Sequence, residues 1–148
     1  MKTIFDKTTR EELIARINKL SENSTAQWGK MNTFQMLKHC TLYEEMLLGK
    51  KRFKRSFIGR LVGKMAMKEL IGDDRPNKRN LPTIPEIIVK EDKGNIADEK
   101  QHWIALINEH AYCANHEFMH AFLGKVTKEQ SGYLAYKHTD HHLRQFNS

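Results

Sequence analysis

Apolar residues recur at three- and four-residue intervals along most of this chain, which is the spacing of one face of an amphipathic α-helix. Leu13, Ile17 and Leu20 show it first, after Thr9 and Glu12, which have the spacing of a capping box. Further helices are predicted over residues 32–49, 55–71, 97–115 and 128–145. Strand signals are confined to residues 84–89. An all-α chain is therefore expected, with four main helices and a shorter one.

Two of these helices have clear start signals. Asn32 or Thr33 would cap the second helix, which Gly49 would end. Thr127, with Gln130 three residues later, would cap the last helix. The predicted helix 97–115 has one apolar side, formed by Trp103, Leu106, Ile107 and Ala114.

The stretch 73–95 separates the third and fourth predicted helices and holds all three prolines, Pro76, Pro82 and Pro85. Proline fixes its own φ and lacks a backbone donor, so this stretch is predicted to be extended. A connection of that length in a compact domain is usually functional or packs across the helices. It is one candidate cover for the mouth of a pocket, and the region between the second and third helices is another.

The length of 148 residues predicts one domain, residues 1–148, with a single core. The first residues contain no apolar segment of the kind found in signal peptides, and the apolar stretch 57–71 is interrupted by charges. A cytoplasmic protein without a transmembrane segment is expected. Cys40 and Cys113 cannot form a disulfide framework and are expected to be buried, reduced thiols.

A formal net charge of +7 is concentrated in a basic segment, residues 50–68. An excess of this kind can serve an acidic partner such as nucleic acid or a membrane surface. No nucleic-acid-binding motif accompanies the charges, so nucleic acid is not expected as a partner. A solvated basic face is the preferred interpretation.

Three histidines have the placement expected of metal ligands. On a helical wheel of residues 32–49, His39 falls in the middle of the apolar face. His138 and His142 lie four residues apart in the last helix, on the side that carries Leu134. That spacing lets two imidazoles reach one ion at about 2.0–2.1 Å. Burying two neighbouring imidazoles without a partner is costly, and a shared ion removes that cost.

The other histidines have plainer interpretations. A single inward histidine is more often a hydrogen-bonded core residue than a ligand, which is the interpretation for His110. His120 is expected to organise the loop before the last helix. His141 lies about 60° from His138 on the wheel and is a candidate for an alternate ligand or for a residue behind the ligands. Asp140 falls nearly opposite and is predicted to lie on the surface.

Three histidines without a carboxylate or thiolate partner describe an open metal site. Structural zinc sites usually close with four protein ligands and favour cysteine, whereas three histidines leave a position for water or substrate. Zinc or nickel is the expected ion, and iron also accepts imidazole ligands.

Four motifs in order give the chain a resemblance to a known family. They are WGKMNTFQMLKHC at 28–40, NLPTIPE at 80–86, HAFLGKVTKEQ at 120–130 and HxxHHLRQ at 138–145. Together they resemble the DinB/YfiT-like superfamily, in its branch of small bacterial proteins without an assigned reaction. The resemblance implies a four-helix bundle with His39, His138 and His142 around a divalent metal. One departure is Ala121, where members often carry proline.

Characterised relatives in that superfamily include thiol-dependent transferases and isomerases. The resemblance therefore implies a metal-activated thiol or water, with a low-molecular-weight thiol as a co-substrate. The first hypothesis is a metal-dependent thiol transferase or hydrolase acting on a small molecule. Its candidate catalytic residues are Tyr43, as a hydrogen-bond donor to substrate, Gln145, which would orient a ligand, and His141.

Two other hypotheses stay open. The absence of an obvious general base beside the histidines favours a non-catalytic stress-response module that binds a metal or small ligand. Binding of nucleic acid or a membrane surface through the basic segment is the third. Relatives in the superfamily often form dimers, so the resemblance also implies a homodimer.

Overall fold

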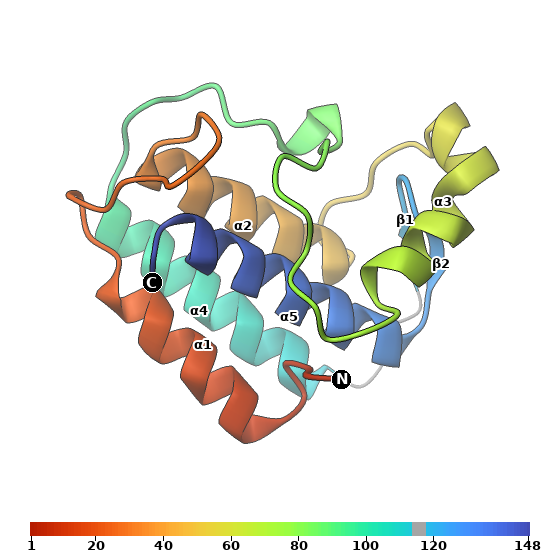
Figure 1. The fold of residues 1–148 in the computed structure, drawn as a ribbon, viewed down its shortest axis with the longest axis horizontal. Helices are drawn as coiled ribbons and strands as arrows, with labels where there is room; N and C mark the ends of the chain where they lie inside the picture. Colours follow the sequence, from red (N-terminus) through yellow and green to blue (C-terminus); the bar gives the residue numbers. More distant parts are fainter. Residues whose placement is uncertain (114–117) are drawn as a thin grey trace.

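The computed structural model describes residues 1–113 and 118–148, and these are mostly helical (Figure 1). The described residues form five α-helices, one 3₁₀ turn and one two-stranded antiparallel sheet. In chain order the elements are α1 (Lys7–Lys19), α2 (Thr33–Leu47), α3 (Phe57–Leu70), η1 (Pro85–Ile87), α4 (Ile96–Tyr112), β1 (Phe118–His120), β2 (Gly124–Val126) and α5 (Lys128–Gln145).

The start signals of α2 and α5 act as expected. Asn32 caps α2 in a full capping box with Gln35, and Thr127 does the same for α5 with Gln130. At α1 the predicted cap is wrong. Asp6 caps this helix instead, because its carboxylate accepts a hydrogen bond from the Thr9 amide at 2.7 Å.

Helix ends differ from the sequence prediction by a few residues, as fraying ends usually do. Within the described residues α4 ends at Tyr112, with Cys113 as its C-cap. The predicted last residues of that helix, Ala114 and Asn115, lie outside the described residues. Residues 84–89, the one strand candidate in the sequence, do not form a strand, because Pro85 starts a 3₁₀ turn there.

The sheet is a hairpin that the sequence did not predict. Phe118 pairs with Val126 and His120 with Gly124. Gly124 has a φ of 97°, which glycine adopts without strain. Each strand is only three residues long, so two-residue alternation has too little length to show.

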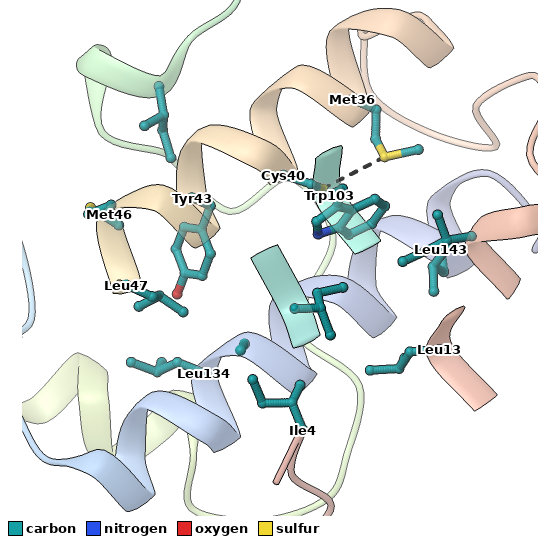
Figure 2. Close-up of a cluster of buried hydrophobic side chains, with 14 of the residues drawn as sticks. Ile4, Leu13, Met36, Cys40, Tyr43, Met46, Leu47, Trp103, Leu134 and Leu143 are labelled. Atoms are coloured by element: carbon teal, nitrogen blue, oxygen red, sulfur yellow. Dashed lines mark hydrogen bonds between the residues drawn. The ribbon is translucent and has the colours of Figure 1, made fainter. Parts of the chain in front are cut away.

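Helices α1, α2, α4 and α5 pack around the apolar core shown in Figure 2, and α2 packs most extensively against α4. Trp103 is fully buried among side chains from these helices, including Leu13, Met36 and Leu143. Cys40 is also buried there and its thiol contacts the sulfur of Met36 at 3.7 Å. Cys113 is only partly buried, contrary to expectation.

Polar side chains also tie the core helices together. His110 is fully buried, as predicted, and its Nδ1 lies 2.9 Å from Glu44 of α2 while its Nε2 lies 3.0 Å from Ser131 of α5. Asp140 is buried rather than exposed, which corrects the prediction. It is bound at 2.7 Å by Arg16 from α1 and by Arg144 one turn along α5. A buried carboxylate needs such partners, and the wheel could not show α1 beside it.

The long connection after α3 packs across α5 and α2, as its length suggested (Figure 1). Asn77 donates to the carbonyl of Lys137 at 3.4 Å, and Ile87 in η1 reaches α2 through its carbonyl. No helix in the described residues has the length and apolar character needed to cross a bilayer.

Candidate metal centre

His39, His138 and His142 come together between α2 and α5. Each offers one ring nitrogen, and these atoms all lie within 4.8 Å of one another. The Nε2 atoms of His39 and His138 are 3.1 Å apart. Two ligands of a tetrahedral ion at about 2.0–2.1 Å lie about 3.4 Å from each other, so this spacing suits a shared ion. We call these three residues the histidine cluster.

Hydrogen bonds on the far side of two rings fix which nitrogen faces the centre. Nδ1 of His39 lies 3.0 Å from the carbonyl oxygen of Ile87. A carbonyl oxygen can only accept, so Nδ1 carries the proton and the neutral ring leaves Nε2 as a free lone pair. Because Nε2 faces His138 at 3.1 Å, a proton or a cation has to lie between the two nitrogens.

His142 is oriented in the same way. Its Nδ1 donates to Oε1 of Gln145 at 2.8 Å, and Nε2 of Gln145 donates to the carbonyl oxygen of Trp28 at 2.7 Å. The second bond fixes which end of the Gln145 amide is the acceptor. Such bonds behind a metal ligand set its tautomer and raise its basicity. Gln145 thus has the orienting contact that the sequence suggested for it.

His138 is held by packing. The ring of Tyr43 stacks on it with 3.7 Å between centroids and 9° between planes. Tyr43 lies one turn after His39 in α2, and His138 lies one turn before His142 in α5. Tyr43 therefore forms a wall of the site, and burial raises its pKa far above the usual value, so its phenol stays protonated.

The electrostatics of the cluster favour neutral imidazoles. Burial lowers the pKa of His142 to about 3, with a smaller contribution from His39. Burial also lowers the pKa of His39, against the raising effect of the bond to Ile87. For His138, burial and then the neighbouring His142 place the pKa well below its usual value. Neutral imidazole is the form that binds metal, so none of the three rings has to lose a positive charge near pH 7.

The donor set fits a divalent metal ion. Three neutral nitrogens converge, and no carboxylate or thiolate of the described residues joins them. Such a set suits zinc, nickel or iron and leaves a coordination position for another molecule. The three histidines would hold the ion from α2 and α5, and core packing holds these two helices in place without the ion.

Two other histidines singled out by the sequence lie near the cluster but outside it. His141 packs edge-on against Trp28, with 5.7 Å between centroids, and lies 5.1 Å from the ring of His142. His120 organises the hairpin turn, as expected, because its Nδ1 accepts the amides of Phe122 and Leu123 at 3.0 and 3.2 Å.

A small pocket with a volume of about 260 Å³ lies next to His141, whose ring is 5.1 Å from that of His142. It is lined by Trp28, Pro76, Asn77, Arg79, His141 and Arg144. The guanidinium of Arg79 lies over the Trp28 ring at 4.4 Å, and no carboxylate is among the lining residues. The lining suits a negatively charged group. We call this the Trp28 pocket.

Sequence reasoning did not find three parts of this region. The carbonyls of Ile87 and Trp28 orient the histidines, and a backbone atom leaves no trace in residue type. Arg79 belongs to a connection whose path is set by packing. Gly29 gave a usable signal: its φ is +82° and a Cβ would lie 2.6 Å from Nε2 of Gln145, so the WG turn needs glycine there.

The fold and the site define a mostly helical protein with three converging histidines, two buried and one half-buried, that could hold one metal ion. A search of family models matches residues 4–148 to a family described as "Protein of unknown function (DUF1569)". That match covers nearly the whole chain, so the chain belongs to the DUF1569 family. Neither the curated proteins nor the solved structures gave a match.

Proposed function

We propose that this chain is a metal-dependent enzyme of the DinB/YfiT-like type, a four-helix bundle that transfers a thiol or hydrolyses a small molecule. The observation that carries the proposal is the convergence of three neutral ring nitrogens within 4.8 Å. In two of the three rings, a hydrogen bond at Nδ1 fixes the tautomer. The four ordered motifs and the mutual packing of α1, α2, α4 and α5 support the superfamily assignment.

A bound divalent ion would supply Lewis-acid chemistry, lowering the pKa of a thiol or water beside it. The chain's own residues prepare that position. Ile87 and Gln145 hold the rings of His39 and His142, which keeps the ligand geometry preorganised. Tyr43 covers one side of His138 and excludes water from it.

The Trp28 pocket supplies a place for the substrate. Arg79 and Arg144 line it, and Arg144 is already bound by Asp140, so Arg79 is the cation available to an incoming group. The Trp28 ring offers a flat apolar surface beside it. We infer that the substrate is a small molecule with a carboxylate or another anionic group next to the reacting atom.

A second candidate function is binding without catalysis, in a stress-response module that senses a metal or a small ligand. The observation in its favour is the absence of any aspartate or glutamate from the histidine cluster and from the lining of the Trp28 pocket, among the described residues. Hydrolysis by proton abstraction needs a general base within hydrogen-bond reach, and a carboxylate is one of the common choices.

Metal content and turnover separate these possibilities. Isothermal titration of the chelator-treated protein with Zn²⁺ or Ni²⁺ should show one ion per chain. His39→Ala should weaken metal binding by more than about 100-fold, a larger loss than is typical for residues that only hydrogen-bond to a metal ligand. His102→Ala, an exposed histidine on α4, is the matched control and should bind normally.

The loaded protein is then assayed with a low-molecular-weight thiol and a haloaromatic acceptor, and with ester substrates that carry a carboxylate. Turnover that is lost in His39→Ala supports the enzyme. One tightly bound ion without turnover favours the binding module. Failure to bind any of the divalent ions would remove both.

A further inference from the structure

Helix α3 presents a row of large apolar side chains to solvent. Its members are Phe57, Ile58, Leu61 and Met65, which are 75%, 64%, 71% and 69% exposed. At about 100° per residue they fall within one arc of about 100° on the helix. Single exposed apolar residues are ordinary, but four in a row on one helix mark an interaction surface.

The opposite side of α3 is already committed to the rest of the molecule. Gly59 and Gly63 are buried, and a Cβ on either would overlap the carbonyl oxygen of Phe122 in the hairpin. Ser56 caps the helix, and its backbone amide bonds to the carbonyl of Ala121 at 2.9 Å. Figure 1 shows α3 at the edge of the molecule beside β1 and β2. The hairpin therefore holds α3 with its apolar row facing outward.

Positive charge surrounds this row. The basic segment, residues 50–68, has eight lysines and arginines and no aspartate or glutamate. Lys50 and Lys51 form ion pairs with Glu109 and Glu45, and Arg55 bonds to the carbonyl of Gly59. The remaining cations are exposed, and no ion pair with the described residues engages them: Arg52, Lys54, Arg60, Lys64 and Lys68.

Three of these cations form a second row on α3. Arg60, Lys64 and Lys68 follow one another at four-residue spacing. On the wheel Arg60 and Lys64 lie at one edge of the apolar row, and Lys68 falls within its arc, just past Met65 along the helix. The nearby acid on the helix, Glu69, is paired with Lys78 at 2.6 Å. An apolar row bordered by lysines and arginines is the arrangement of a helix that lies in the plane of a membrane interface.

We propose that α3 docks on the surface of an anionic lipid bilayer, with its apolar row below the headgroups and its cations against the lipid phosphates and carboxylates. Nucleic acid would satisfy the cations but gives four large apolar side chains nothing to bury against. An antiparallel pair of α3 helices from two copies of this chain would bring one cation row against the other. Charge complementarity therefore favours the lipid surface. This inference is independent of the metal centre.

Flotation of the full chain with vesicles tests the proposal. Phosphatidylcholine vesicles containing phosphatidylserine should bind the protein, and pure phosphatidylcholine vesicles should bind it far less. Raising the ionic strength from about 0.01 M to about 1 M shortens the Debye length from about 30 Å to about 3 Å and should weaken binding strongly. Phe57→Trp should show a blue shift of its added emission on binding, which pure electrostatic contact would not give.

Two double variants separate the contributions. Leu61→Gln with Met65→Gln should lower partitioning by at least about 10-fold, because two side chains that would enter the bilayer become polar. Lys64→Gln with Lys68→Gln should lower it on anionic vesicles and reduce the salt dependence. Leu81→Gln, an exposed apolar residue in the long connection, is the control and should partition normally. All four changed side chains on α3 are exposed, so far-ultraviolet circular dichroism should match the unchanged chain.

Four results would overturn the proposal. One is equal binding to charged and uncharged vesicles, and another is no binding to either. The third is a dimer in sedimentation equilibrium that dissociates in the Leu61→Gln, Met65→Gln variant, which would assign the apolar row to a second copy. The fourth is a duplex DNA or RNA that competes fully with the vesicles at equal charge, which would assign the cations to nucleic acid.

Discussion

At the scale of single residues, Gln145 shows how much of the proposed metal site lies outside its three candidate ligands. It accepts a hydrogen bond from His142 and donates one to Trp28, so a single amide links a ligand to the turn that lines the pocket. Its bonding capacity is used on both ends, which neither leucine nor glutamate can reproduce.

Replacing Gln145 tests that role. Gln145→Leu should lower metal affinity by about 10–100-fold, because His142 loses the acceptor that fixes its tautomer. Gln145→Glu keeps an acceptor for His142 and loses only the donor to Trp28, so its affinity should fall less. Calorimetric titration with Zn²⁺ measures both. Gln101→Leu, at an exposed position of α4, is the control, and equal affinities in all four proteins would exclude the orienting role.

His120 predicts a pH dependence of stability. Burial lowers its pKa from 6.5 to about 4, with a smaller effect from Arg55. Between these values the unfolded chain binds the proton and the folded chain does not, so stability rises with pH across this window. The contribution of His120 to the free energy of unfolding is complete above about pH 6.5 and is lost as the pH falls toward 4. From pH 7.5 to 5 the loss assigned to His120 is about 2 kcal/mol.

Urea unfolding at the two pH values measures this. In His120→Asn the side-chain oxygen can still accept the amides of Phe122 and Leu123, and no titrating group remains at this position. The variant should therefore lose about 2 kcal/mol less than the unchanged chain between pH 7.5 and 5. Parallel pH profiles for the two proteins would show that His120 titrates normally in the fold.

Residue-level prediction from sequence succeeded where one helix determined the outcome. The faces of His39, His138 and His142 follow from helical periodicity within α2 and α5, and the structure brings the three together. Asp140 failed because its environment includes Arg16 of α1, a residue 124 positions away. A wheel describes one helix and carries no information about what packs behind it.

At the scale of elements, α3 differs from the core helices because it packs against the hairpin through two glycines. Gly59 and Gly63 are poor helix formers, and their value is the close approach they permit to the hairpin at Phe122 and Leu123. The sequence predicted the helix but not this contact. The hairpin itself escaped prediction because pairing between two three-residue strands depends on their tertiary setting.

Gly63→Ala is therefore expected to destabilise the protein although alanine favours helix. The added Cβ would overlap the carbonyl oxygen of Phe122 and lie 3.2 Å from the backbone of Leu123. Overpacking of this kind costs about 1–3 kcal/mol, and the helix propensity of alanine returns up to about 1 kcal/mol. Urea unfolding should show a net loss of about 1–2 kcal/mol.

Lys64→Ala is the control for that substitution. Lys64 is exposed beside Gly63, and its replacement should change stability by less than about 0.5 kcal/mol. If Gly63→Ala instead raises stability by the propensity difference alone, α3 does not sit as tightly on the hairpin as the glycine contacts indicate.

At the scale of the whole molecule, the histidine cluster joins α2 to α5 across 99 positions of sequence. The four helices around the core hold these two elements together before any ion binds. An ion bound only by the folded chain must therefore stabilise that fold by mass action. The stabilisation grows with the free metal concentration and disappears when the metal is removed.

Thermal unfolding with and without metal measures this linkage. At a free Zn²⁺ concentration of about 100 Kd the fold should gain about 2.7 kcal/mol, which for a domain of this size raises Tm by about 10 °C. A chelator should reverse the shift, and His39→Ala should show none. A Tm that does not respond to any of the divalent ions would argue that the cluster is a structural core of neutral imidazoles.

The separation between His39 and its two partners also has a consequence for biosynthesis. His39 leaves the ribosome long before α5 is made, and a lone imidazole does not retain an ion against the other ligands of a cell. The complete donor set exists only after α5 has docked against α2. An ion bound at the cluster as proposed would therefore be acquired last, by the finished fold, and its identity would be decided by what the surroundings supply at that moment.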